Sequence, residues 1–127
     1  MDKVVIRTTE APQAIGTYSQ GIKSGNLVFT SGQIPLNSDT GELINSDFKS
    51  DVRQVLTNLD GVLNGGGSSL KQAIKLTVFL TDLSKFSQVN EVFMEFFPEN
   101  PPARSAVQVS ALPMNACIEI EAVGFVE

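Results

Sequence analysis

The chain has 127 residues, a hydrophobic fraction of 42% and a net charge of −5, values that predict one soluble globular domain over residues 1–127. The acidic balance disfavours general nucleic-acid binding, since phosphate backbones attract basic surfaces. The chain has no histidine and a single cysteine, Cys117. This excludes a Ser-His-Asp triad, histidine-ligated metals, an internal disulfide and a thiolate zinc cluster.

No apolar run approaches the roughly 20 residues of a membrane span. The N-terminal apolar run of three residues is also far shorter than the apolar region of a secretory signal. We therefore expect a cytoplasmic protein without a membrane partner, or one imported by means of a segment that lies outside this sequence.

In chain order, the pattern predicts strands near residues 3–8 and 26–32, with a weaker one at 16–23. A helix follows, because seven apolar residues fall on one face of a 3.6-residue period: Phe48, Val52, Val55, Leu56, Leu59, Val62 and Leu63. Asn45 or Ser46 is expected to cap it, with Asp47 favourable at its positive end. Asn64 and the following glycines end it.

A strand at 73–81, with Ile74 on its apolar side, leads to a second helix from about residue 84 to 97. Asp82 or Ser84 can cap that helix, and Pro98 ends it. Strands at 105–110 and 117–126 complete the order β-β-β-α-β-α-β-β, which predicts an α+β fold.

Two helices cover only one face of such a sheet. We expect the aliphatic sets of the last two strands, Val107 and Val109 in one and Ile118 and Ile120 in the other, to face the helices. The opposite face carries large apolar groups and has no third layer, so another subunit is its expected cover.

Two sets of polar residues are candidates for chemistry. Arg104 follows a double proline and offers a planar fork of donors for a carboxylate or phosphate, although the spacing alone favours a surface arginine at a strand start, paired with an acid. Glu119 and Glu121 share one strand face, where partial burial would raise their pKa values and suit acid–base work. The plainer alternative is a pair of solvated acids on an edge strand.

Two short segments are further candidates. Residues 16–21 bracket Tyr18 with two glycines, but they lack a phosphate-loop ending and also fit a bulged strand. Residues 30–35 leave a strand with hydroxyls and N–H groups that could bind an anion, or form an ordinary strand end.

Together these segments resemble the RidA (YjgF-type) family of imine and enamine deaminases over nearly the whole chain. The matching motifs are Ala11-Pro12, Ala14-Ile15-Gly16, Tyr18-Ser19-Gln20-Gly21, Thr30-Ser31-Gly32-Gln33-Ile34-Pro35, Thr77-Val78-Phe79-Leu80, Asp82-Leu83, Val89-Asn90, Pro102-Ala103-Arg104-Ser105 and Ile118-Glu119-Ile120-Glu121-Ala122. The resemblance implies a chorismate-mutase-like subunit with a single mixed sheet and two helices on one face. It also implies a homotrimer whose sheets face inward around inter-subunit pockets.

The implied reaction is hydrolysis of 2-imino acids or enamines, such as 2-iminobutanoate and 2-iminopropanoate, to 2-oxo acids and ammonia. Arg104 would bind the substrate carboxylate and Glu119 would position the attacking water. The resemblance assigns the rest of the pocket to Tyr18, Ser31, Gly32, Asn90 and the backbone of Ala106. No metal or organic cofactor is implied, since a protonated imine is already electrophilic.

Two positions depart from the family pattern. Ala106 stands where many relatives have cysteine, which removes thiol chemistry there, and Thr17 stands where proline is common. Two other functions remain open: a non-catalytic small-molecule-binding or chaperone-like regulator on the same trimer, and an endoribonuclease that inhibits translation. The acidic charge and the lack of histidine argue against the ribonuclease.

Overall fold

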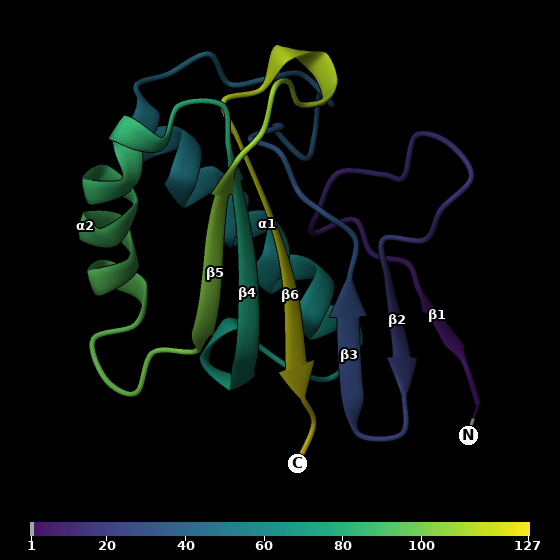
Figure 1. Ribbon diagram of the computed structural model, residues 1–127. Coiled ribbons are helices and arrows are strands. Elements are labelled where there is room, and N and C mark those ends of the chain that lie inside the picture. Colours follow the sequence, from purple (N-terminus) through teal and green to yellow (C-terminus); the bar gives the residue numbers. More distant parts are fainter. Residues whose placement is uncertain (1) are drawn as a thin grey trace.

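The computed structural model describes residues 2–127 and contains one six-stranded sheet with two helices packed on one side of it (Figure 1). The strands lie in the spatial order β1-β2-β3-β6-β4-β5. Their bounds are β1 Val4–Ile6, β2 Gly21–Ser24, β3 Leu27–Thr30, β4 Ala73–Leu80, β5 Ala103–Gln108 and β6 Ile118–Phe125. Only β4 and β5 pair in parallel, so the sheet is mixed, and the predicted α+β order is confirmed.

Helix α1 spans Phe48–Gly65 and buries the apolar face that the periodicity predicts. Its N-cap is Asp47 rather than Asn45 or Ser46, because the Asp47 carboxylate accepts a hydrogen bond from the Ser50 N–H at 2.9 Å. This bond lowers the pKa of Asp47.

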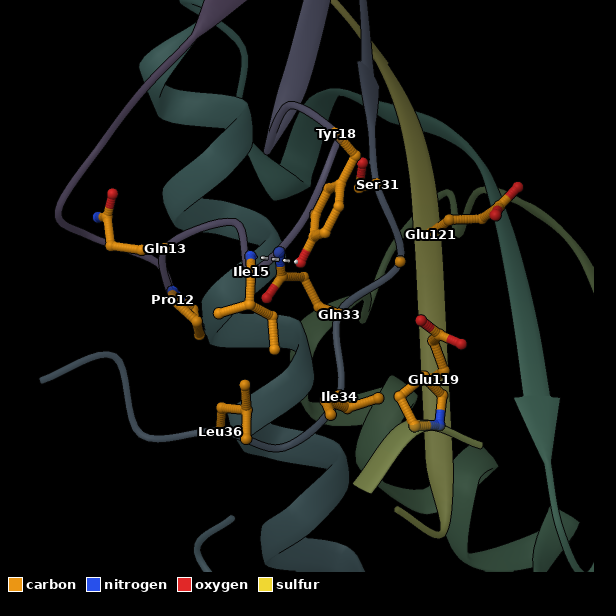
Figure 2. Close-up of a pocket in the computed structure, with 12 residues that line it drawn as sticks. Pro12, Gln13, Ile15, Tyr18, Ser31, Gln33, Ile34, Leu36, Glu119 and Glu121 are labelled. Atoms are coloured by element: carbon orange, nitrogen blue, oxygen red, sulfur yellow. Dashed lines mark hydrogen bonds between the residues drawn. The ribbon is translucent and has the colours of Figure 1, made fainter. Parts of the chain in front are cut away.

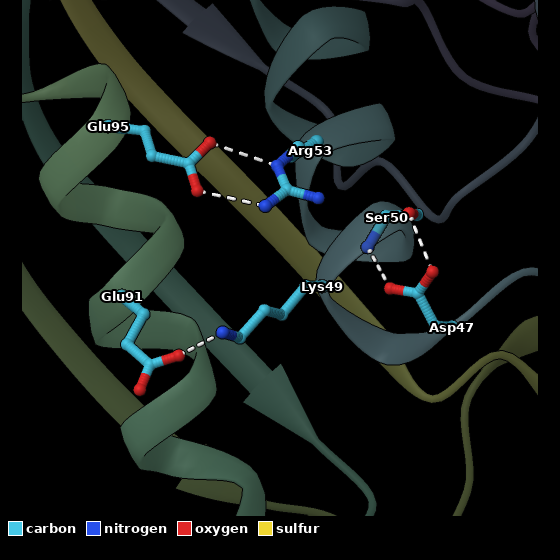
Figure 3. Close-up of polar contacts among 6 residues, drawn as sticks. All are labelled: Asp47, Lys49, Ser50, Arg53, Glu91 and Glu95. Atoms are coloured by element: carbon cyan, nitrogen blue, oxygen red, sulfur yellow. Dashed lines mark hydrogen bonds and ion pairs between the residues drawn. The ribbon is translucent and has the colours of Figure 1, made fainter.

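Helix α2 spans Phe86–Phe96 and follows a short 3₁₀ turn, Leu83–Lys85, that Asp82 caps through the Ser84 N–H. Two ion pairs join it to α1 (Figure 3). Arg53 donates to both carboxylate oxygens of Glu95 at 2.9 Å, and Lys49 pairs with Glu91 one helical turn away. These pairs are partly exposed, so solvent screens them and they contribute little stability.

The core lies between the helices and the central strands. Ile118 and Ile120 of β6 face the helices as predicted, together with Leu76, Val78 and Leu80 of β4. Ile74 was expected on the same side but is 44% exposed, because a register shift between Ala73 and Lys75 turns it out of the core.

The prediction for β5 was also wrong. Its parallel register sets Arg104 opposite Leu76, so Arg104 faces the helices instead of Val107. Val107 lies opposite Phe79 on the other side of the sheet and is 44% exposed. The inversion is tolerated because the flat guanidinium of Arg104 packs on the aromatic rings of α2.

The sheet surface away from the helices, called the open face below, has no covering layer among residues 2–127 (Figure 1). It carries large apolar groups. Phe29 of β3 is 43% exposed and lies beside Val123 of β6, and Val107 lies on the edge strand β5. An uncovered apolar face was expected from the helix count. None of the helices in residues 2–127 has the length and apolar character needed to cross a bilayer.

Candidate active site

A cavity of about 490 Å³ lies between the loop at residues 12–18, the segment at 31–36 and strand β6 (Figure 2). Twelve residues line it: Pro12, Gln13, Ile15, Tyr18, Ser31, Gly32, Gln33, Ile34, Leu36, Pro113, Glu119 and Glu121. Four predicted site residues meet here, namely Tyr18, Ser31, Gly32 and Glu119.

Strand β6 carries Glu119 and Glu121 on the open face, two residues apart. Burial, and secondly the charge of Glu121, raise the pKa of Glu119. The Glu119 side chain packs against Gly32, where an added Cβ would lie 2.8 Å from the Glu119 carboxyl carbon. The absence of a side chain at position 32 therefore lets the carboxylate lie beside the 31–33 backbone. A half-buried carboxyl group with a raised pKa is a stronger base than a solvated one, which suits general acid–base work.

Backbone and amide contacts fix the segment that carries Gly32. Gln33 and Ile120 exchange two backbone hydrogen bonds, at 2.9 and 3.1 Å. Farther on, the buried Asn58 amide of α1 donates to the carbonyls of Ile34 and Leu36 at 3.3 and 2.9 Å. The Ser31 hydroxyl donates to the Ser19 carbonyl at 2.6 Å, so it also ties this segment to the loop before β2.

A buried glutamine organises the loop on the other side of the cavity. Gln20 is 4% exposed, accepts from the Thr8 N–H at 2.8 Å and donates to the Pro12 carbonyl at 2.8 Å. Tyr18 is half exposed, and its hydroxyl accepts from the Ile15 N–H at 3.2 Å. The sequence did not reveal the roles of Gln20 and Asn58. The only feature that could have indicated them is an amide side chain inside or beside a run of apolar residues.

Arg104 and Asn90 lie together in a second hollow of about 430 Å³, bounded by α2 and the residues before β5. Arg104 Nη1 donates to Asn90 Oδ1 at 2.7 Å, and its guanidinium lies over the rings of Phe86 and Phe93, 4.8 and 5.3 Å from their centroids. No carboxylate within residues 2–127 forms a salt bridge with Arg104. The guanidinium therefore keeps donors for an anion.

Within one chain, Arg104 and Glu119 do not meet. Arg104 is paired with Leu76 on the helix side of the sheet, whereas Glu119 is paired with Phe79 on the open face. Ala106 shares the helix side with Arg104 and lies on β5, which forms one edge of the sheet. In one copy of the chain, Arg104 and Glu119 thus face opposite sides of the sheet.

Residues 2–127 hold no group of three or more His, Cys, Asp or Glu side chains placed to bind a metal ion. Cys117 is outside both hollows and donates to Asp51 Oδ2 at 3.3 Å. Burial, and secondly Asp51, raise the pKa of the Cys117 thiol to about 11. The thiol is therefore protonated at neutral pH and is a poor nucleophile.

Known proteins resemble this chain over nearly its whole length. The model of the family described as Endoribonuclease L-PSP matches residues 8–126. A RutC family protein of Pyrococcus horikoshii is 50% identical over 125 residues, covering 98% of this chain and 99% of the relative. The chloroplastic Reactive Intermediate Deaminase A of Arabidopsis thaliana is 44% identical over 121 residues, covering 95% of this chain and 65% of the relative.

The crystal structure of Escherichia coli TdcF with bound serine superposes with a TM-score of 0.93 at 43% identity, covering 98% of this chain and 100% of that one. The similarity in sequence and structure agrees with the fold that the motifs implied. The chain therefore belongs to the Endoribonuclease L-PSP family, whose members include the reactive intermediate deaminases.

Proposed function

We propose that this protein hydrolyses reactive 2-imino acids and their enamine tautomers, such as 2-iminopropanoate and 2-iminobutanoate, to 2-oxo acids and ammonia. The observation that carries the proposal is the position of Glu119, whose half-buried carboxyl group has a raised pKa and lines a cavity. A deaminase of this family would need both the carboxyl group and the cavity. Two relatives add support: one is named a reactive intermediate deaminase, and TdcF holds serine, an α-amino acid.

The proposed active site forms between copies of the chain. Arg104 has no acidic partner in the described part of the chain and faces away from Glu119, so it would bind the carboxylate of a substrate held against the Glu119 of a neighbouring copy. Asn90 holds the Arg104 guanidinium through its 2.7 Å hydrogen bond. An inward-facing homotrimer, one domain per subunit, would also cover the apolar open face.

The proposed chemistry is water addition followed by loss of ammonia. The Glu119 carboxylate takes a proton from water as the water oxygen bonds to the imine carbon, and the electron pair of the C=N bond moves to nitrogen. The same carboxyl group then returns the proton to nitrogen. Because the substrate is the protonated imine, this nitrogen is now an ammonium group. Its C–N bond breaks as the hydroxyl group gives its proton to the Glu119 carboxylate and becomes the C=O group, and ammonia leaves. A raised pKa suits a group that must accept and donate in one cycle.

The remaining residues would shape the pocket. Tyr18 packs over the substrate and limits access of bulk water, while Ser31 and Gly32 form the wall beside Glu119. The backbone of Ala106, next but one to Arg104 on the edge strand, would hydrogen-bond near the imine. No step needs a thiol, so alanine at position 106 is compatible with the reaction.

The test couples a serine or threonine dehydratase, which releases such imines, to this protein and follows 2-oxo acid release. Acceleration over the dehydratase alone supports the proposal. Binding of 2-oxo acids without acceleration would instead favour the regulator, and cleavage of RNA would favour the endoribonuclease. Equilibrium sedimentation tests the assembly, since a monomer at micromolar concentration would remove the basis for an inter-subunit site.

A further inference from the structure

One polar side chain in the cavity has no hydrogen-bond partner in the part of the chain that the structure describes. The Gln33 residue is 6% exposed, yet its carboxamide makes no hydrogen bond to any other part of residues 2–127. It lines the same cavity as Glu119. Among residues 2–127 only Asp51 Oδ1 is both fully buried and unpaired, so the Gln33 amide still reaches the space of the cavity, and a ligand that fills this space would have to pair with it. This amide is therefore a candidate to bind whatever occupies the cavity.

The position of Gln33 is fixed in advance. Its backbone exchanges two hydrogen bonds with Ile120, and the following residues are held by Asn58. In Figure 2 its amide lies on the side of the cavity where Ile15 and Tyr18 lie, with Glu119 on the other side. A ligand whose reacting carbon is at Glu119 would therefore direct its side chain toward Gln33.

The rest of the cavity defines the chemistry of that side chain. Around Gln33 the lining is mostly apolar, and it includes Ile15, Ile34 and Leu36. The two charged side chains in the lining, Glu119 and Glu121, are both acidic, and the lining contains no lysine or arginine. A negatively charged side chain would be repelled here, whereas a purely hydrocarbon one would leave the Gln33 amide unpaired.

We propose that Gln33 is a specificity-determining residue that selects 2-imino acids with an uncharged, hydrogen-bonding side chain, such as a carboxamide. This inference rests on the proposed deaminase function. The carboxamide of Gln33 supplies both a donor and an acceptor, so it pairs with another carboxamide through two hydrogen bonds. Few well-placed polar groups in an apolar pocket are the usual source of such selectivity.

The test uses three imines of nearly equal size, derived from asparagine, leucine and aspartate. D-Amino-acid oxidase generates the first two and D-aspartate oxidase the third, and semicarbazide trapping reports how fast each imine disappears. We expect kcat/KM for the asparagine-derived imine to exceed that for the leucine-derived imine about tenfold, with the aspartate-derived imine slowest. Gln33→Met should abolish the preference for the carboxamide over the hydrocarbon.

The matched control is Gln13→Met. Gln13 lines the same cavity but is exposed and already donates to the Thr8 carbonyl at 2.9 Å, so its loss should leave the ratio unchanged. Equal rates for the two imines in the parent protein, or a parental ratio in Gln33→Met, would overturn the inference.

Failure of the proposed function can be told apart from failure of this inference. If the proposed function is wrong, the parent protein will not accelerate the hydrolysis of any imine, and 2-iminopropanoate is no exception. Calorimetry with the corresponding 2-oxo acids decides the inference in that case as well. Tighter binding of the carboxamide compound than of 4-methyl-2-oxopentanoate supports it, and the reverse order refutes it.

Discussion

Gly32 and Glu119 fit together so closely that an added Cβ at position 32 would lie 3.0 Å from the Glu119 Cγ and even closer to its carboxyl group. The segment at Gly32 is tied to β6 by the Gln33–Ile120 bridge, so it cannot easily move aside. The carboxylate is the group that would have to move if position 32 gained a side chain.

Gly32→Ala is therefore expected to displace Glu119 and to lower kcat/KM by about 10- to 100-fold, since a misplacement near 1 Å has effects of that size. The measurement is imine hydrolysis, with thermal denaturation to verify folding. In a Glu119→Gln background the same substitution should cost much less, because the displaced group is already inactive. Equal costs in the two backgrounds would show that Gly32 acts elsewhere.

Glu119→Gln keeps the size of the side chain but removes its basic carboxylate. We expect imine hydrolysis to slow by about 10²- to 10⁴-fold while 2-oxo acids still bind, measured by the coupled assay and by calorimetry. Glu42→Gln is the matched control, since Glu42 is exposed and outside both hollows. Turnover at the parental rate in Glu119→Gln would refute the water-activating role and favour the regulator.

Arg104→Lys keeps the charge but loses the two-point fork and the stacking on Phe86 and Phe93. The expected cost is about 2–4 kcal/mol in transition-state binding, or roughly 30- to 1000-fold in kcat/KM, with weaker 2-oxo acid binding. Arg53→Lys makes the same exchange in the bidentate pair with Glu95 and should leave activity intact. If Arg104→Lys binds 2-oxo acids normally, another residue holds the carboxylate.

Asp51 links stability to pH. It is 9% exposed, its Oδ1 has no hydrogen-bond partner, and burial raises its pKa. A carboxyl group with a higher pKa in the folded state destabilises the fold when ionised, so this contribution to stability rises as the pH falls through the folded-state pKa toward the unfolded-state value near 4. Asp51→Asn should be more stable than the parent at pH 7, and the difference should shrink at pH 4.

Urea denaturation at both pH values measures this effect, with the exposed Asp39→Asn as the control for a lost surface charge. The parent also contains Glu119, whose raised pKa acts in the same direction, and Asp82 and Glu95, whose lowered pKa values act in the opposite one. The comparison of variant with parent isolates Asp51. A constant difference between them at the two pH values would contradict the prediction.

The helices could be predicted because each apolar face repeats many times, and a single exception does not change the pattern. The short strand β5 has no such redundancy. Its alternation fits either side, and the choice of Arg104 for the helix side depends on two phenylalanines of α2 that the strand pattern does not reveal. The register shift that exposes Ile74 is likewise a property of the pairing with β6 rather than of β4 itself.

The candidate site was predicted in part. Tyr18, Ser31, Gly32 and Glu119 came from motifs, and the structure brings them to one cavity. The supporting amides of Gln20 and Asn58 could not be predicted, since the loop groups that they hold lie 8 to 24 residues away and are mostly backbone carbonyls. A sequence pattern records which residues are buried more readily than which carbonyl an amide will meet.

The opposite orientation of Arg104 and Glu119 has a consequence for mutant subunits that are mixed in one assembly. If each pocket takes its arginine from one chain and its glutamate from another, two different defects can compensate each other. Arg104→Lys and Glu119→Gln subunits, each nearly inactive alone, would regain activity after being unfolded and reassembled together. In an equal mixture about one quarter of the pockets would contain both intact residues. Two alleles of this protein that fail separately would then complement each other in the same cell.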